Sequence, residues 1–243
     1  MTPSSDIFGL ALNDIDKGQT TQDIIVSSSI ADDDYLPLAY LCRSYDEMPQ
    51  IEQQALKLCK GKTLDIGSGA GSHSLWLHEQ GIEVVGLDLS RGAIDFSRKR
   101  LEKSSATTPY QMLHQDVFEH NGQYDTLLLL MNGTGIFGTI ANVDDSLQHL
   151  KALLSAEGQI LIDSSDIKYM YEDEDGGFWV DTHKEYYGEV TYQMHYKGEK
   201  GPLFEWLYLD FETLASFATQ NGLQCRLIME GPHYDYLARL TLA

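Results

Sequence analysis

The sequence has few cysteines, and they form no recognisable pattern. Its 243 residues contain three, Cys42, Cys59 and Cys225, and no two of them form a C-x-x-C pair. A disulfide framework uses an even number of cysteines, and a cysteine zinc site uses pairs at short spacing. The sequence therefore argues against both. No group of histidines and acidic residues has the spacing of metal ligands either, so we expect no metal.

Positive charge is also scarce. The chain has 17 lysines and arginines against 37 aspartates and glutamates, which gives a formal net charge of −20. A field of that sign opposes binding to nucleic-acid phosphates and to anionic lipid surfaces. We therefore expect no nucleic-acid partner and no membrane partner. The charge suits a neutral or cationic small molecule, and it equally serves solubility.

Long apolar runs are missing as well. The longest, such as residues 127–131, are far shorter than the roughly 20 residues that span a bilayer. The first six residues lack the basic and apolar regions of a signal peptide, so we expect a cytoplasmic protein. Hydrophobic residues still make up 42% of the chain, enough for the core of one α/β domain. Composition leaves the oligomeric state open.

From residue 62 onward, short apolar segments alternate with amphipathic ones. The predicted strands are 62–66, 83–87, 110–114, 124–130 and 159–163, and the predicted helices are 72–80, 91–103 and 143–154. Strands separated by helices in this rhythm pair in parallel through right-handed crossovers. Four consecutive leucines, 127–130, are typical of a central strand that is buried on both faces.

The pattern changes after residue 163. Two strand-like runs, 186–197 and 203–209, are joined by a glycine-containing turn and predict a long hairpin. A helix at 211–221 and two more strands, 223–229 and 236–242, follow, and the short link between these strands makes the last pair antiparallel. The whole chain is therefore an α/β protein with a mixed seven-stranded sheet, an antiparallel last strand and a hairpin inserted after the fifth strand.

The N-terminal part has a different character. Residues 1–34 are polar and predict a loose arm or short helices, and helical spacing begins near Tyr35 and is clearer over 49–58. We divide the chain into an N-terminal arm with lid helices, 1–45, and a main domain, 46–243. Residues 164–209, the loop and hairpin, belong to the main domain and are expected on the substrate side.

The most informative motif lies at the end of the first predicted strand. Asp65 closes the strand, and Gly67, Gly69 and Gly71 follow at alternate positions before a helix begins. Glycines at this spacing let the backbone turn tightly and approach a ligand, and the helix N-terminus points N–H groups at it. A carboxylate at position 65 would repel a pyrophosphate but attract an ammonium or sulfonium group. The motif therefore predicts a cofactor site with a cationic group.

Three more segments should meet this motif. In open parallel sheets, ligands bind beyond the carboxyl ends of the strands, where the strand order reverses. The segments that follow the second, third and fourth strands are 88–90, 115–117 and 131–135. The acid at position 88 comes about twenty residues after the glycines, the spacing at which a carboxylate accepts hydrogen bonds from ribose hydroxyls.

These motifs resemble the class I, Rossmann-like S-adenosylmethionine-dependent methyltransferases. The resemblance covers residues 45–163 by motif and extends to the end of the chain by element order. It implies a three-layer α/β/α Rossmann-like sandwich, S-adenosylmethionine as the cofactor and methyl transfer to a small molecule.

The resemblance also implies roles for the matching residues. Asp65 would support the methionyl amine, and Asp88 would bind the ribose. Leu89 would pack on adenine, while Asp116, beside Val117, would accept from the adenine amino group. The other implied cofactor residues form the glycine loop and the end of the fourth strand: Gly67, Ser68, Gly69, Met131 and Asn132.

Other interpretations remain open at this level. An NAD-dependent oxidoreductase would usually have a glycine at position 72, which is serine, and an apolar residue at 65. An aminopropyltransferase typically has an acidic pair after the fourth strand, where this chain has Asn132-Gly133. A non-catalytic module that binds the cofactor also fits, because methyl transfer requires no signature side chain. Taken singly, Asp116 and Asn132-Gly133 are equally typical of turns.

The substrate side offers weaker hypotheses. Asp163 and Asp166 end the fifth strand and are candidates for a general base or cation anchor, or for turn caps. Arg43 could pair with the cofactor carboxylate, Tyr45 could cover the cofactor, and His73 could border the carboxylate end. Further candidates are three histidines in segments that could reach the site: His183, His195 and His233. Aromatic residues crowd 164–209 and either line a pocket for a flat or cationic substrate or pack on the sheet.

Overall fold

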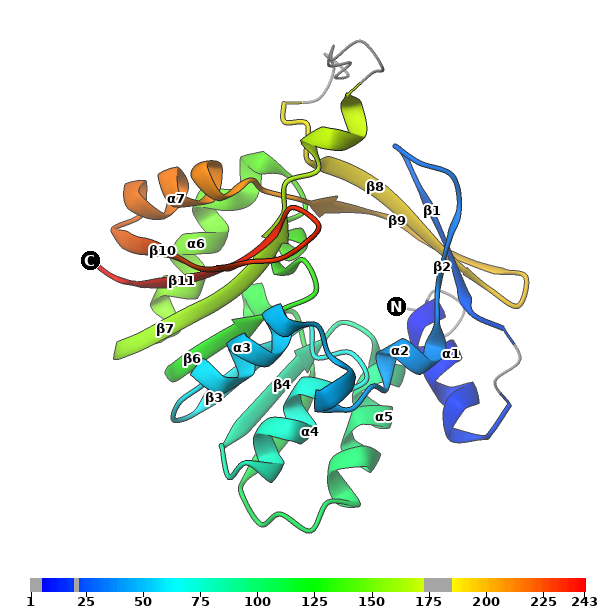
Figure 1. Ribbon diagram of the computed structural model, residues 1–243. Coiled ribbons are helices and arrows are strands. Elements are labelled where there is room, and N and C mark those ends of the chain that lie inside the picture. The colour runs from blue at the N-terminus through cyan, green and yellow to red at the C-terminus, as the bar shows by residue number, and fades with distance from the viewer. Residues whose placement is uncertain (1–5, 20–21, 173–184) are drawn as a thin grey trace.

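The computed structural model describes residues 6–19, 22–172 and 185–243. Its centre is a seven-stranded sheet with the strand order β10-β11-β7-β6-β3-β4-β5 (Figure 1). The strands are β3 (Thr63–Ile66), β4 (Val84–Asp88), β5 (Tyr110–His114), β6 (Tyr124–Leu129), β7 (Leu154–Ser165), β10 (Leu223–Glu230) and β11 (Asp235–Leu242). Strands β3 to β7 pair in parallel, and β11 is antiparallel to both β7 and β10. The predicted mixed sheet with an antiparallel last strand is confirmed.

Helices cover both faces of this sheet and make the predicted three layers. They are α3 (Gln50–Leu58), α4 (Ser72–Glu79), α5 (Arg91–Glu102), α6 (Val143–Ala152) and α7 (Phe211–Gln220). Leu127 and Leu129 bury their side chains in the core beneath α6 and α7, while Leu128 faces α3 on the other side. This alternation explains why a run of leucines forms the central strand. Within the described residues, no helix combines the length and the apolar character needed to cross a membrane.

A second, four-stranded antiparallel sheet stands apart from the first. Its order is β2-β1-β8-β9, formed by β1 (Ile24–Ser28), β2 (Asp34–Leu36), β8 (Glu189–Tyr196) and β9 (Glu199–Leu207). The predicted hairpin is thus confirmed, but it does not stand alone. The prediction of a loose arm, and of helical structure from Tyr35, was wrong for residues 24–36. These residues become strands because β1 pairs with β8, a partner from the far end of the chain that local periodicity cannot reveal.

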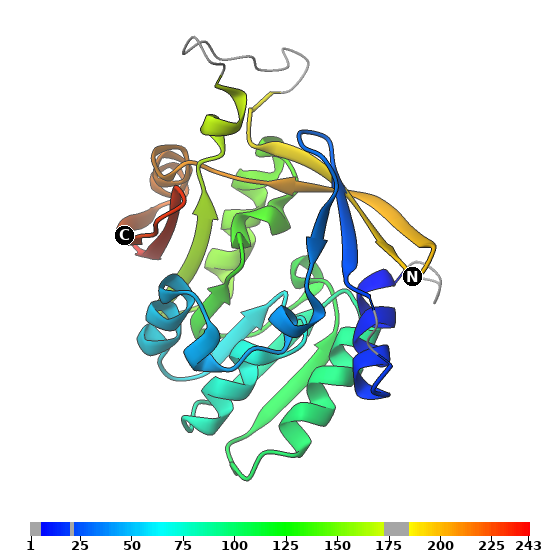
Figure 2. The ribbon, with the colours of Figure 1, turned by 45° about the vertical axis from the view of Figure 1, so that its right-hand side comes forward.

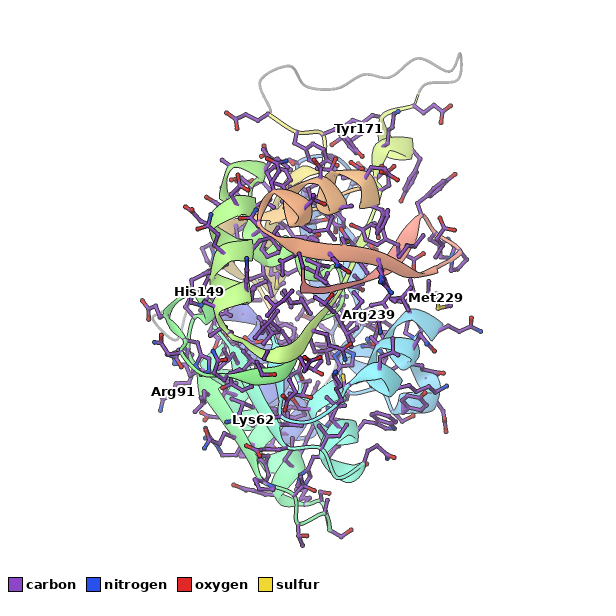
Figure 3. The ribbon with its side chains drawn as sticks, turned by 90° about the vertical axis from the view of Figure 1, so that its left-hand side faces the viewer. Lys62, Arg91, His149, Tyr171, Met229 and Arg239 are labelled. Atoms are coloured by element: carbon purple, nitrogen blue, oxygen red, sulfur yellow. The ribbon has the colours of Figure 1, made fainter. Side chains whose placement is uncertain are left out.

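The second sheet is attached to the main domain at both ends. At one end Asp14, on helix α1 (Ile7–Asp16), accepts from Lys197 Nζ at 2.7 Å next to the β8–β9 turn. At the other end the hydroxyl of Thr134 donates to the Leu207 carbonyl oxygen at 2.9 Å. Figure 2 shows β8 and β9 running across the top of the molecule toward α1. Figure 3 views the opposite edge, where β10 and β11 carry Met229 and Arg239.

One carboxylate joins α1 to α5. Asp6 Oδ1 accepts from the Gly9 N–H at 2.9 Å and from the Ser90 hydroxyl at 2.7 Å, and Oδ2 accepts from the Gly92 N–H at 3.0 Å. It therefore satisfies orphan donors in the first turns of two helices at once. The two helices touch through glycines, since a Cβ on Gly92 would lie 2.4 Å from Gly9 Cα.

We expect Gly92→Ala to lower the free energy of unfolding by about 1–3 kcal/mol, because the added methyl group overpacks the α1–α5 contact. In a helix without this neighbour the same change would stabilise. Urea unfolding followed by circular dichroism measures the difference. Arg91→Ala, one residue away and exposed, serves as the control and should change stability by less than about 0.5 kcal/mol. Equal stability of G92A and the parent would contradict the packing argument.

Candidate active site

A cavity of about 530 Å³ lies where the main sheet, α1 and the second sheet meet. Residues at the carboxyl ends of β3, β4, β5 and β6 line one side of it. The strand order reverses here, because β4 and β5 lie on one side of β3, and β6 and β7 lie on the other. Ligands of open α/β sheets bind at this point, and the volume is in the range typical of small-molecule sites.

The glycine loop forms the floor of the cavity. Gly67, Gly69 and Gly71 all have left-handed φ angles, +71°, +52° and +77°, which a residue with a side chain adopts only under strain. The N–H groups of Gly67 and Ser68 both donate to the Leu87 carbonyl oxygen at 2.9 Å, which joins the loop to β4. The Ser68 hydroxyl lines the cavity, is buried and has no partner within the described structure, so it can serve a ligand.

Asp65 is fully enclosed beside this loop. Its Oδ2 accepts from the Ser74 hydroxyl at 2.5 Å. Burial raises the pKa of the carboxyl, and the nearby His73 and the Ser74 hydrogen bonds oppose that rise. A buried carboxylate in the lining favours a ligand with a positive group, because a cation lowers the cost of keeping the acid ionised.

Asp88 joins the glycine loop to the start of α5. Its Oδ2 accepts from the Gly69 N–H at 2.8 Å, and its Oδ1 accepts from the Ser90 N–H at 2.7 Å. Burial raises the pKa of Asp88 to about 6, although both backbone donors favour the ionised form. Each carboxylate oxygen keeps a further lone pair, so the group can accept two more hydrogen bonds from a ligand.

Large apolar side chains stand exposed in the same cavity. Leu89 is 52% exposed, Phe118 39% and Met131 38%, and all three line the cavity. Asp116 and Val117 lie beside Phe118 in the lining, and Asp116 Oδ1 accepts from the Phe118 N–H at 2.9 Å. Asp116 therefore forms a turn and lines the site, so its two interpretations do not exclude each other. Exposed apolar side chains around a polar centre are typical of a ligand site.

Arg43 and His73 reach the cavity as a pair held by a third residue. Arg43 Nη2 donates to both carboxylate oxygens of Glu52, at 2.6 Å to Oε1, and its Nη1 donates to the Tyr40 carbonyl oxygen at 2.7 Å. His73 Nε2 lies 2.7 Å from Glu52 Oε2. Burial opposes ionisation of Glu52, but His73 and Arg43 outweigh it and hold its pKa below the usual value. Sequence reasoning missed Glu52, because an acid on an amphipathic helix looks like part of its solvated face.

Tyr45 and Asn132 were predicted at the cofactor, but the cavity lining does not include them. The Tyr45 ring stacks on Trp76, with centroids 4.6 Å apart, and lies in the core beside α3. Asn132 Oδ1 accepts from the Ser165 hydroxyl at 2.9 Å and so joins two strand ends. Both side chains serve packing and turn structure, which motif spacing does not distinguish from ligand contact.

The two carboxylates proposed as a base also lie outside the lining. Asp163 accepts from the N–H groups of Met131 and Gly133 at 3.1 and 2.8 Å. It thereby holds a turn in which Met131 and Asn132 have left-handed φ angles of 67° and 59°. Burial raises its pKa to about 6. Asp166 accepts from the Lys168 N–H at 2.9 Å and the Tyr187 hydroxyl at 2.8 Å. The geometry thus favours the turn-capping alternative for both.

The structure describes two of the three histidines that were predicted to reach the site. His195 Nε2 lies 3.1 Å from the Ser27 hydroxyl and links β8 to β1. His233 lies in an exposed turn, where its N–H donates to Asp235 at 2.9 Å. His183 lies outside the described residues. Neither His195 nor His233 lines the cavity.

The other side of the cavity comes from segments that the motifs did not identify. Phe8 from α1 lies over the glycine loop, 3.6 Å from where a Cβ of Gly69 would stand. The second sheet contributes apolar side chains on one face: Leu36, Met194, Pro202, Phe204 and Trp206. The N-terminal arm and the hairpin thus both contribute side chains to the cavity, although no local pattern marked these residues.

Comparison with known proteins agrees with this geometry. The family described as "Methyltransferase domain" matches residues 64–160. A crystal structure of an S-adenosylmethionine-dependent methyltransferase from Bacteroides fragilis, in complex with S-adenosyl-L-homocysteine, is 39% identical in sequence. It superimposes with a TM-score of 0.89 and covers 100% of this chain and 97% of that chain. The protein belongs to the S-adenosylmethionine-dependent methyltransferases.

Two curated relatives each match part of this methyltransferase. A putative methyltransferase of Bacillus subtilis (strain 168), YqeM, is 32% identical over 107 residues, which are 43% of this chain and 42% of the relative. A ubiquinone biosynthesis O-methyltransferase of Actinobacillus pleuropneumoniae serotype 7 (strain AP76) is 34% identical over 71 residues, 29% of this chain and 30% of the relative. The chain thus matches less than half of the length of either relative.

The raised pKa of Asp88 predicts how cofactor affinity depends on pH. If ribose hydroxyls donate to this carboxylate, binding requires its ionised form. Below about pH 6 the proton must leave first, so we expect the affinity for S-adenosylhomocysteine to fall about tenfold per pH unit below that value. Calorimetry between pH 5 and 8 measures it. Asp88→Asn should weaken the dependence, leaving the part that comes from Asp65, while Asp95→Asn, on the exposed face of α5, should keep it in full. A flat profile for the parent protein would contradict the ribose assignment.

Proposed function

We propose that this methyltransferase transfers the methyl group of S-adenosylmethionine to a small molecule. The acceptor would lie between the strand ends of the main sheet and the second sheet. One observation carries the proposal: the same cavity is lined by the glycine loop and Asp88 on one side and by Phe204 and Trp206 on the other. Cofactor and acceptor would therefore share one enclosed space, as in-line displacement requires.

In this proposal, the residues that line the cavity would contact the ribose, the adenine and the methionyl part of the cofactor. Asp88 has free lone pairs for the ribose hydroxyls, and Leu89 and Phe118 offer apolar surface for adenine. Asp65, at the end of β3, faces the methionyl amine in this assignment, and its charge suits the sulfonium. Arg43 brings a positive charge, and His73 a ring, to the side of Asp65, where the methionyl carboxylate would lie. Each of these groups of the cofactor would thus meet a side chain of complementary charge or polarity.

When bound, S-adenosylmethionine supplies a methyl group on a positively charged sulfur, and its transfer leaves a neutral thioether. The protein's share of the work is to orient the acceptor and exclude water. Asp163 and Asp166 are occupied in turns, so no role as a base is assigned to them. An acceptor whose nucleophilic atom carries no proton that must leave needs no base in the transfer step. We therefore attribute the catalysis to positioning.

The lid is part of the same proposal. Residues 1–45 would act as a lid on a methyltransferase domain of residues 46–243, since Phe8 and Leu36 from this segment line the cavity. The alternative of a non-catalytic cofactor-binding module leaves the apolar acceptor side without a role. An NAD-dependent oxidoreductase would place a pyrophosphate against the buried acids, Asp65 and Asp88, and their charge opposes it.

Binding selectivity is the first test. We expect S-adenosylhomocysteine at 100 times its Kd to stabilise the protein by about 2.7 kcal/mol, which raises its melting temperature. NAD at the same concentration should leave the melting temperature unchanged, because a pyrophosphate meets the acidic lining. Differential scanning fluorimetry measures both. Stabilisation by NAD alone would overturn the proposed cofactor.

Turnover is the second test. Incubating the protein with a metabolite extract and methyl-labelled S-adenosylmethionine should label a small molecule and produce S-adenosylhomocysteine in equal amount. Asp88→Ala should weaken cofactor binding by about 1–3 kcal/mol through the loss of charge-assisted hydrogen bonds. Asp95→Ala is the matched control and should bind as the parent does. Cofactor binding without any labelled product from diverse extracts would favour the non-catalytic alternative.

A further inference from the structure

The inner face of the second sheet points to the chemical class of the acceptor. We infer that the acceptor is a flat apolar or aromatic molecule without an anionic group, held between Phe204 and Trp206 on one side and Met131 and Ile136 on the other. This inference rests on the proposed function, because it assumes that the cofactor occupies the glycine-loop side of the cavity.

The register of the hairpin decides which side chains face the cavity. Phe204 pairs with Tyr192, and Trp206 pairs with Val190, so these residues share one face of β8 and β9. Phe204 and Trp206 line the cavity, as does Met194 on the same face. Leu203 belongs to the opposite face and is 68% exposed. Because successive side chains alternate across a strand, Met194, Phe204 and Trp206 face the cavity while Leu203 faces away from it.

The Glu205 side chain belongs to the outer face. Its two carboxylate oxygens accept from the hydroxyl of Thr191, its cross-strand partner, at 3.0 and 3.1 Å. The side chains of the inner face that line the cavity are apolar: Leu36, Met194, Pro202, Phe204 and Trp206. An acceptor in contact with that face meets hydrocarbon and aromatic rings.

The aromatic wall is held in a fixed position. A Cβ on Gly135 would lie 1.8 Å from Trp206 Cε2, so the indole packs directly on the backbone after β6. Phe204 meets Trp206 edge to face, with centroids 6.2 Å apart and an interplanar angle of 83°. Aromatic side chains have few rotatable bonds, so fixing such a pair costs little conformational entropy. The pair still offers ring faces on which a ligand can stack. A flat apolar acceptor gains most from this wall.

The charges of the lining exclude an anionic acceptor. The acids Asp6, Asp65, Asp88 and Asp116 all line the cavity. Among the described residues of the lining, the two basic side chains, Arg43 and His73, both contact Glu52. A phosphate or carboxylate on the acceptor would meet this acidic surround, within a protein of net charge −20, and would lose its hydration without a dedicated cation.

A matched pair of fluorescent dyes tests the inference on the protein loaded with S-adenosylhomocysteine. N-phenyl-1-naphthylamine is neutral, and 8-anilinonaphthalene-1-sulfonate adds one sulfonate to the same skeleton. We expect the neutral dye to bind at least about tenfold more tightly and to quench tryptophan fluorescence. Phe204→Ala and Trp206→Ala should weaken its binding by about tenfold, in line with the loss of a stacking partner. Leu203→Ala, the neighbouring outward residue, should leave it unchanged.

Each outcome decides a part of the inference. Equal affinity for the two dyes would overturn the exclusion of anions. Failure of the neutral dye to bind, or an equal loss with Leu203→Ala, would overturn the assignment of the acceptor to the inner face. If Trp206→Ala does not fold, Trp206→Phe, which keeps a ring, and Phe204→Ala carry the comparison. Calorimetric titration with S-adenosylhomocysteine distinguishes the two proposals. Absence of binding would contradict the proposed function itself, whereas normal binding leaves the dyes to test the acceptor alone.

Discussion

The cavity wall formed by the second sheet depends on one non-local contact, the antiparallel pairing of β1 with β8. The pairing places Ile25 opposite His195 and Ser28 opposite Tyr192, so residues near the start of the chain complete a sheet built by a late hairpin. Because the β8–β9 hairpin is attached to α1 at one end and to the segment after β6 at the other, the inner face of that sheet lies against the cavity at the carboxyl ends of the parallel strands. Without this pairing, β8 and β9 would be a two-stranded ribbon, which is marginally stable on its own.

Buried acids organise the cofactor side. Asp6, Asp88 and Asp163 each accept hydrogen bonds from two backbone N–H groups, and each joins segments that are distant in sequence. A carboxylate is suited to this work because it accepts several hydrogen bonds at once and satisfies donors that the turns leave free. The pKa values of Asp88 and Asp163 are raised because burial destabilises the ionised form of each carboxylate more than these backbone hydrogen bonds stabilise it. A ligand that donates to Asp88 would offset part of that cost.

Local spacing predicted the parts of the site that lie close together along the chain. Asp65, Gly67, Gly69 and Asp88 line the cavity at the strand ends where spacing predicted them, because strand ends and tight turns impose their own residue types. Asp163 shows where such reasoning fails. An acid at the end of a strand was predicted as a possible base, yet it caps the turn at Met131 to Gly133. Both roles need an acid at a strand end, and only the positions of its partners separate them.

The sequence by itself determined the parallel sheet and the glycine loop, because each follows from short-range periodicity and from residues a few positions apart, while the type of cofactor followed from the resemblance of these motifs to a known family. Tertiary structure alone decided that residues 24–36 are strands, that Glu52 holds Arg43 and His73, and that Phe204 and Trp206 face the cavity. These features arise from pairings between segments far apart in the chain. Hydrogen bonding and burial at such pairings outweigh local preference, and no local pattern records the partner.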